Sequence, residues 1–217
     1  RAIKGVSKWK MLETRAKTIE GWLDALQDDG RIHGDVYTMG AVTGRMTHNN
    51  PNIANIVSND KPYGVECRSC WTVPDGYSLV GMDAKGLELR MLAHYMKDEK
   101  YIDAVVNGDP HLFNQKAAGL ETKAQAKTFI YAFLYSAGAA KLGAIVGGSH
   151  KEGEQLKQKF LGNMPQLNKL INAVKRKSTR GYIRGIDGRR LYVRQVRSSL
   201  NTLLQGAGAI VCKQWSI

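Results

Sequence analysis

The sequence predicts an α+β fold in which helices predominate. Apolar residues recur with helical periodicity through much of the chain, and a Gly- and Asn-rich stretch at residues 30–56 favours short strands and turns. Residues 180–194 have a hairpin pattern that turns at Asp187-Gly188. The chain has 217 residues, of which 43% are hydrophobic and 24% charged. This composition argues against disorder, and no apolar run approaches the roughly 18 residues that a membrane span needs.

The first half of the chain begins with a helix and contains a buried strand. Residues 7–29 space apolar side chains helically between charges and end at Gly30, which predicts an amphipathic helix. Residues 77–83, YSLVGMD, predict a buried strand that ends on Asp83. A helix is predicted directly afterwards, at residues 87–96.

The rest of the chain is mostly helical. Asp109-Pro110 combines an N-cap acid with a proline at the first helical position, so it predicts the start of a helix that ends near Gly119. Further helices are predicted at residues 121–136, at 151–161, from the break at Pro165 to Lys177, and at 198–217.

Positive charge is concentrated in the second half. The chain has 32 Lys and Arg against 19 Asp and Glu, a formal net charge of +13. Residues 1–108 are neutral in this count, and between residues 169 and 197 ten basic side chains face one acid, Asp187. A solvated helix face is one interpretation. The density favours a polyanionic partner, and charge alone does not choose among DNA, RNA and an anionic membrane surface.

The three cysteines, Cys67, Cys70 and Cys212, are too few for a disulfide framework, which favours a reducing compartment. Cys67-x-x-Cys70 is half of a zinc site or a redox motif. Because no second pair accompanies it, we interpret these cysteines as residues without a metal or redox function.

One stripe of the helix at 121–136 carries two lysines and two tyrosines, since Lys123, Lys127, Tyr131 and Tyr135 recur every four residues. An ordinary amphipathic helix with half-buried tyrosines explains this pattern. Alternatively, the lysines hold a triphosphate and the rings stack on a base or sugar. The residues on another side, which can pack, are Phe129, Ile130 and Phe133.

Asp83 is a candidate ligand for a divalent cation. A carboxylate at the end of a strand is a common place to hold Mg²⁺, which prefers hard oxygen ligands and also keeps waters and substrate phosphates in its shell. A solvated loop acid is the alternative.

Four motifs resemble those of the family A DNA polymerases, in the family's order. D-A-K-G-L-E-L-R, with L-A-H behind it, is similar to motif A, and K-A-Q-A-K-T-F-I-Y-A-F-L-Y-S-A-G is similar to motif B. T-G-R-M-T-H-N-N-P-N-I-A-N-I resembles the family's T-G-R segment, and L-N-T-L-L-Q-G-A-G-A resembles its primer-terminus helix. The segments A-K-T-F-I-Y of motif B and L-N-T-L-L-Q of the primer-terminus helix are most similar to those of the bacteriophage branch.

The resemblance implies a role for each matching residue in the first two motifs. Asp83 matches the first of two aspartates that bind a pair of Mg²⁺ ions, and Glu88 matches the steric gate that excludes a ribose 2′-hydroxyl. Lys127 matches the lysine that meets the triphosphate and can act as general acid. Tyr131 matches the ring that distinguishes deoxy from dideoxy sugars.

Other matches extend the expected site to the templating base and the duplex. Tyr135 matches the ring stacked at the templating position, and His111 matches a triphosphate ligand, with an ordinary surface histidine as the alternative. The residues that match those contacting the primer–template minor groove are Arg45, Arg197, Asn201 and Gln205.

The chain departs from the family in three places. Lys123 stands where an arginine usually contacts the triphosphate, which keeps the charge but loses the bidentate fork, so weaker nucleotide binding is expected. Lys85 stands in motif A where small or polar residues are usual, and nothing in the sequence explains it. No His-Asp-Glu motif C occurs before Ile217.

The resemblance implies a partial right-hand polymerase, with an incomplete antiparallel palm and complete helical fingers. The expected division is the end of the thumb or a connecting helix at 1–30, the first part of the palm at 31–100, the fingers at 101–179, and the second part of the palm at 180–217.

We therefore expect part of a DNA-templated DNA polymerase that adds deoxynucleotides to a primer 3′ end by two-metal phosphoryl transfer. Its expected partners are primer–template DNA, deoxynucleoside triphosphates and a further segment or chain carrying motif C, without which little activity is expected. No membrane partner is expected, and the host cytoplasm is the expected location. The alternatives are a non-catalytic DNA-binding fragment of polymerase origin and an RNA polymerase relative.

Overall fold

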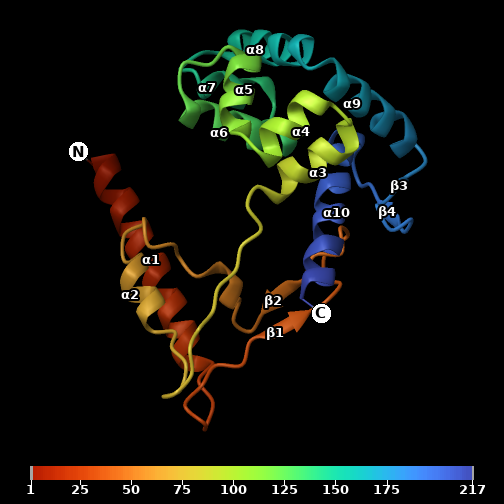
Figure 1. The fold of residues 1–217 in the computed structure, drawn as a ribbon. Helices are drawn as coiled ribbons and strands as arrows, with labels where there is room; N and C mark the ends of the chain where they lie inside the picture. The colour runs from red at the N-terminus through yellow and green to blue at the C-terminus, as the bar shows by residue number, and fades with distance from the viewer. Residues whose placement is uncertain (1, 217) are drawn as a thin grey trace. The chain divides into compact units, whose positions relative to one another are not determined.

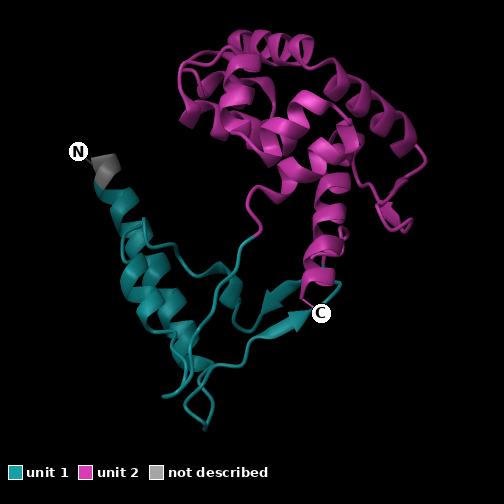
Figure 2. Ribbon diagram, in the orientation of Figure 1, with its two compact units in different colours: residues 1–40, 46–83 teal, residues 41–45, 84–217 magenta. Residues whose placement is uncertain are grey.

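A computed structural model describes residues 2–216 of the chain, with side chains from Gly5 onwards. The chain divides into two compact units, shown in different colours in Figure 2. Unit 1 contains residues 1–40 and 46–83, and unit 2 contains residues 41–45 and 84–217.

Unit 1 combines helices with one small antiparallel sheet. Val36 pairs with His48 at the centre of the β1–β2 register, and the Trp22 ring packs edge-on against Trp71 with 5.2 Å between ring centroids. The elements, labelled in Figure 1, are α1 (Ala2–Asp24), β1 (Asp35–Tyr37), β2 (Thr47–Asn49), the 3₁₀ turn η1 (Ile53–Asn55) and α2 (Gly64–Ser69).

The first helix is confirmed, but its predicted end is wrong. It ends at Asp24, because the chain turns back after that residue. The backbone N–H of Gln27 donates to the Arg31 carbonyl at 2.8 Å, and a single β-bridge joins Leu26 to Ile32. Gly30 has a φ of 73°, a left-handed conformation that suits glycine and closes this turn.

The predicted buried strand at residues 77–83 is also wrong. The segment has no regular structure, and Leu79 and Val80 are each 77% exposed. An apolar, β-branched segment becomes a strand only when a neighbour satisfies its backbone hydrogen bonds. Within the part of the chain that the structure describes, no strand pairs with this segment.

Unit 2 is a helical assembly with one hairpin. Its elements are α3 (Leu87–Met96), α4 (Glu99–Val106), α5 (Pro110–Ala118), α6 (Lys123–Leu134), α7 (Ala139–Ala144), α8 (His150–Asn163), α9 (Pro165–Ser178), β3 (Tyr182–Arg184), β4 (Arg190–Tyr192), the 3₁₀ turn η2 (Val196–Ser198) and α10 (Ser199–Trp215).

Side chains cap the starts of α4, α5, α6 and α8 in unit 2. Asp109 accepts hydrogen bonds from the backbone N–H groups of His111 and Leu112, with Pro110 in the first turn, as predicted. Thr122 begins α6 and Ser149 begins α8, each with a reciprocal capping box. The predicted helices are confirmed with small shifts of their ends, whereas α4 and α7 were not predicted.

The hairpin predicted around Asp187-Gly188 is confirmed. Ile183 pairs with Leu191 in an antiparallel register, and the Gly185 N–H donates to the Arg189 carbonyl at 2.9 Å. Ile183 and Leu191 are buried with Val174 and Leu203 in a small apolar cluster between the hairpin, α9 and α10.

The main core of unit 2 is built around α6. Phe129 and Ile130 are fully buried, and the Phe129 ring meets Phe160 of α8 edge-on with 5.1 Å between centroids. Leu89 and Leu92 of α3 belong to the same core. The predicted packing side of α6 is therefore confirmed for Phe129 and Ile130, while Phe133 is half-buried beside them.

We predict that Phe129→Ala lowers the free energy of unfolding of unit 2 by about 3–5 kcal/mol, because it removes a fully buried ring and leaves a cavity. Chemical denaturation followed by circular dichroism measures this loss. Val106→Ala is the control: Val106 is 55% exposed on α4, so its truncation should change stability by less than about 0.5 kcal/mol. Equal losses for both variants would contradict this description of the core.

Candidate functional site

The lysine and tyrosine stripe of α6 adjoins its buried side, since Lys123 and Lys127 are three residues before the buried Ala126 and Ile130. Lys123 and Lys127 are exposed and Tyr131 is half-buried, whereas Tyr135 forms the C-cap of the helix and is 49% exposed. The packing of Phe129 in the core fixes the rotation of α6 about its axis, and so directs the stripe away from the core.

The start of α5 is joined to the start of α6 by an ion pair. The Lys123 ammonium contacts the Asp109 carboxylate, which also caps α5. The hydrogen bond from Lys123, followed by the backbone N–H groups of α5, holds the pKa of Asp109 below its usual value. The carboxylate therefore stays ionised and keeps His111, two residues later, beside the stripe.

His111 lies against the α6 stripe as a largely neutral imidazole. Burial lowers its pKa, the Asp109 carboxylate opposes this effect, and the positive charges of Lys127 and Lys123 add to it. Its ring centroid is 6.2 Å from that of Tyr131. His111 Nδ1 is buried and has no hydrogen-bond partner among the described residues, which is unusual for a buried polar atom and suits a site for a polar ligand.

A second set of predicted residues lies on α10 and the turn before it. Asn201 and Gln205 are half-buried and one helical turn apart, and Arg197 in η2 is exposed. The Arg197 Nε group donates to Gln195 Oε1 at 2.8 Å. The structure therefore presents the two amides on one side of α10, with the arginine one turn before them.

Arg189 of the hairpin holds the segment that carries Arg45. Its Nη2 group donates to the Thr43 carbonyl at 2.7 Å and to the Gly206 carbonyl of α10 at 3.4 Å. Gly44 has a φ of 78°, and a Cβ there would lie 2.4 Å from Arg189 Nη1, so only glycine fits under the guanidinium. Arg45 itself is exposed. Sequence reasoning missed Arg189, because nothing distinguishes it from its basic neighbours.

Ser136 joins the end of α6 to η2 and was also missed. Its Oγ donates to the Arg197 carbonyl at 2.7 Å, across 61 residues of sequence. Ser136 has a φ of 60°, which costs a residue with a Cβ about 1–3 kcal/mol. The feature that distinguishes Ser136 is its left-handed backbone conformation at the end of α6. The amino-acid sequence does not reveal backbone angles, so this feature could not be used.

The boundary between the two units falls within motif A, between Asp83 and Ala84 in the sequence. Asp83 is exposed in unit 1, and Glu88 is half-buried in the first turn of α3 in unit 2. Arg90 Nε donates to the Lys85 carbonyl at 2.9 Å, which shapes the turn before α3, but no contact explains the exposed Lys85 side chain. Because Asp83 belongs to the other unit, its part in a common site stays a prediction.

The described residues do not form a complete metal site. No group of three or more His, Cys, Asp or Glu side chains gathers within residues 2–216 in a way that could hold an ion. Asp83 offers one carboxylate, whereas Mg²⁺ takes six oxygen ligands from protein, water and substrate together. Likewise, none of the described helices has the length and hydropathy to cross a membrane.

The fold belongs to the polymerase class. The chain matches the POL domain of Pol1 from M. smegmatis, solved in complex with DNA primer-template and dNTP, with a TM-score of 0.79 and 27% sequence identity. The match covers 92% of this chain and 39% of that one. It confirms the predicted α+β fold class of partial palm and helical fingers.

The chain belongs to DNA polymerase family A, whose family model matches residues 1–217. It is 42% identical over its whole length to the DNA-directed DNA polymerases of Enterobacteria phage T3 and Escherichia phage T7. It is 40% identical, over 71% of its length, to that of Escherichia phage Phieco32. The chain spans 35% of the length of the T3 and T7 polymerases. These findings confirm the family resemblance and its phage branch.

We predict that Arg189→Lys increases hydrogen exchange of the amides in residues 41–45 by roughly tenfold or more. A lysine lacks the guanidinium plane that packs over Gly44 and places Nη2 between the two carbonyls, and hydrogen bonds from charged donors contribute about 1.5–3 kcal/mol. Mass spectrometry of the exchanged peptides measures the change. Arg190→Lys is the control, because Arg190 lies over the Tyr182 ring and contacts neither carbonyl. Unchanged exchange in Arg189→Lys would show that the guanidinium does not hold this segment.

Proposed function

We propose that this chain is the part of a DNA-directed DNA polymerase that binds the incoming deoxynucleotide and the primer–template end. The observation that carries the proposal is the gathering of His111, Lys123, Lys127 and Tyr131 on one side of α5 and α6. The relatives are named DNA-directed DNA polymerases, and this chain spans about a third of their length. The activity accordingly belongs to the whole polymerase.

The cations of the α6 stripe would bind the triphosphate. Lys127 is exposed and forms no ion pair with an acid of residues 2–216, so its ammonium is available to phosphate oxygens. Lys123 is shared with Asp109, and a lysine lacks the arginine fork, so its contribution is smaller than an arginine would make. His111 Nδ1 supplies an unpartnered polar atom beside them. In the transfer itself, Lys127 would neutralise charge on the leaving pyrophosphate and donate a proton to it.

The remaining nucleotide contacts concern the sugar and the base. We assign Glu88 as the steric gate against a ribose 2′-hydroxyl and Tyr131 as the ring beside the sugar. Tyr135, at the exposed end of α6, would stack at the templating position. Tyr131 suits a place beside the sugar, because a half-buried ring on a rigid helix is fixed in position before the nucleotide arrives.

The primer–template end would lie along α10. We assign Asn201 and Gln205 to the minor-groove edges of the bases, where acceptors common to all pairs allow a check of shape without reading sequence. Arg45 and Arg197 would contact the same duplex. Arg189 supports this arrangement, since it fastens the Arg45 segment to α10.

We propose two Mg²⁺ ions as the cofactor, with Asp83 as one ligand. Such ions stabilise the attacking and leaving oxygens in phosphoryl transfer. One carboxylate does not make the site, so a second must come from a further segment of the polymerase, and the chemical step is not assigned to this chain alone. The phage relatives favour action in the host cytoplasm. The roles proposed for the segments are thumb end or connecting helix for 1–30, palm for 31–100 and 180–217, and fingers for 101–179.

Lys127→Ala should weaken binding of a deoxynucleoside triphosphate to the chain by about tenfold or more, because a charged hydrogen-bond donor is lost. Titration with a fluorescent nucleotide measures the affinity. Lys141→Ala, which removes an exposed lysine from α7, should leave it unchanged. Equal effects of the two variants would mean that general positive charge, and not this stripe, attracts the nucleotide.

Primer extension distinguishes the polymerase from a non-catalytic DNA-binding fragment. We expect negligible extension from the chain alone, and extension when the segment carrying motif C is supplied. In that complemented enzyme, Asp83→Ala should reduce the rate by about a hundredfold or more and leave DNA affinity unchanged, because one metal ligand is lost. Asp75→Ala, another exposed acid of unit 1, is the control. Robust extension by Asp83→Ala would refute the assignment.

Nucleotide affinity should rise as the pH falls toward the pKa of free His111. Burial lowers that pKa in the free protein, and a bound triphosphate would raise it, so binding takes up a proton over the interval between the two values. Affinity measured from pH 8 to pH 5.5 should show this rise, and His111→Gln should abolish it. If the rise persists in His111→Gln, another group is responsible.

A further inference from the structure

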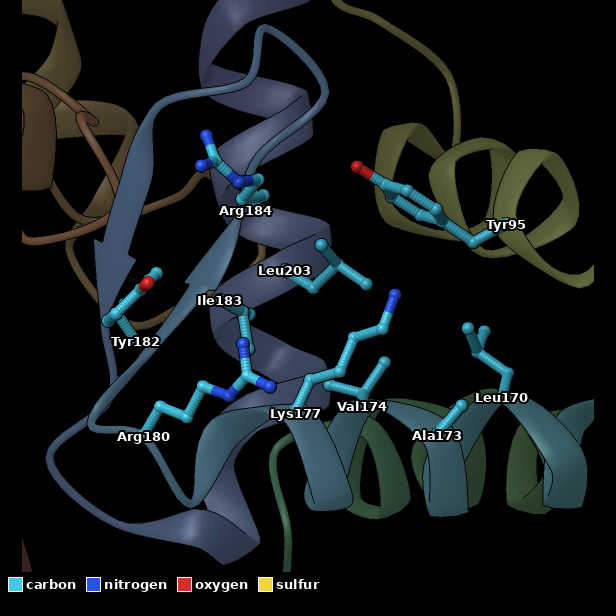
Figure 3. A pocket seen from close by; sticks show the side chains of 10 residues that line it. All are labelled: Tyr95, Leu170, Ala173, Val174, Lys177, Arg180, Tyr182, Ile183, Arg184 and Leu203. Atoms are coloured by element: carbon cyan, nitrogen blue, oxygen red, sulfur yellow. The ribbon is translucent and has the colours of Figure 1, made fainter.

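A cavity of about 440 Å³ lies in unit 2 on the side of α10 away from the proposed primer–template residues. Figure 3 shows it between α9, the β3–β4 hairpin and Tyr95 of α3. Leu203, which contributes to the cavity, is two residues from both Asn201 and Gln205. Two residues turn an α-helix by about 200°, so the cavity faces away from those amides. Whatever binds here does not compete with a duplex held by them.

The floor of this cavity is apolar. Leu170, Ala173, Val174, Ile183 and Leu203 line it, and three of these belong to the small apolar cluster beneath the hairpin. Its volume lies within the range of small-molecule sites, about 300–1,000 Å³, which typically combine apolar walls with a few polar groups.

The polar groups of the residues that line the cavity are three cations and the hydroxyls of Tyr95 and Tyr182. Lys177, Arg180 and Arg184 line it and are exposed, and none of them forms an ion pair with an acid of residues 2–216. Arg184 Nη1 donates to the Gly188 carbonyl at 3.0 Å, which leaves Lys177 and Arg180 as the cations without a partner of this kind. In Figure 3 the Lys177 side chain extends from α9 toward Tyr95. The Tyr95 hydroxyl is buried and has no hydrogen-bond partner in the described part of the chain. Asp187 is the acid of the hairpin, and it pairs with Arg189.

We infer that this cavity binds one nucleotide of a single-stranded DNA segment, with its base against the apolar floor and its phosphates on Lys177 and Arg180. Only an unpaired nucleotide offers both groups, because a duplex hides the apolar faces of its bases by stacking and pairing. The Tyr95 hydroxyl would bond a polar edge of the base. The inference rests on the proposed function in one respect, that DNA is the partner, and it adds a second contact for a strand outside the duplex.

Binding of oligodeoxythymidine to the chain tests the charges. Lys177→Ala/Arg180→Ala should weaken it by about tenfold or more and lower the slope of log affinity against log salt by about 1.4, since each phosphate contact to a single strand contributes about 0.7. Lys169→Ala/Arg176→Ala is the matched control, because it removes the same charges from positions of α9 outside the cavity. Equal losses in both double variants would overturn the inference.

Two further measurements test the base and the hydroxyl. An oligomer with abasic residues should bind about tenfold more weakly than oligodeoxythymidine, because stacking of a base contributes about 1–3 kcal/mol. Tyr95→Phe should lower affinity by several fold and keep the fold. Equal affinity for the abasic oligomer would overturn the inference. So would displacement of oligodeoxythymidine by poly-glutamate at equal concentration, which would assign the cavity to an acidic peptide.

Binding of a blunt-ended DNA duplex and of a deoxynucleotide, measured in parallel, separates this inference from the proposed function. The cavity variants should leave both unchanged. If the chain binds single strands through the cavity but neither duplex nor nucleotide, the proposed function fails and the inference stands. If it binds duplex and nucleotide and the cavity variants bind single strands normally, the inference fails alone.

Discussion

The site depends on the burial of one side of α6. Phe129 and Ile130 are fully buried and fix the rotation of the helix, and the Phe129 ring is locked edge-on against Phe160. Because residues four apart share a helix face, this packing sets the direction in which Lys123 and Lys127 project beside the core. On a helix that could turn about its axis the groups of the stripe would not be held in place, so the nucleotide-binding role proposed for the stripe depends on the core.

Both ends of α6 are tied to the surfaces that its proposed function requires. At the start, the Lys123 contact with Asp109 joins the stripe to the helix that carries His111. At the end, the Ser136 hydroxyl joins it to Arg197. Ser136 makes the second contact in a left-handed conformation, which costs about 1–3 kcal/mol of conformational free energy. Its hydrogen bond contributes only about 1 kcal/mol to stability. The surrounding fold therefore holds Ser136 there, and α6 is positioned from both ends.

Features set by neighbours in sequence could be predicted, and features set by distant segments could not. The Asp109 cap and the Asp187-Gly188 turn each depend on a few adjacent residues, and the structure has both. Residues 77–83 have the composition of a strand, but a strand also needs a partner elsewhere, so the prediction failed. Arg189 and Ser136 act across 146 and 61 residues, and no local pattern indicates such contacts. The motif residues were found through family resemblance, and contacts confirm only that some of them lie together.

The excess positive charge of the second half has more than one use. The Arg189 guanidinium donates to two backbone carbonyls, and Arg184 donates to the Gly188 carbonyl at 3.0 Å. The Arg190 guanidinium lies 4.8 Å from the centroid of the Tyr182 ring. These arginines help to build the hairpin and its contact with α10. Net charge therefore overstates the number of cations free for a polyanion. Lys177 and Arg180, which line the cavity beside the hairpin, form no ion pair with an acid of the part of the chain that the structure describes. The same basic segment can in this way build the hairpin and still present charge at its surface.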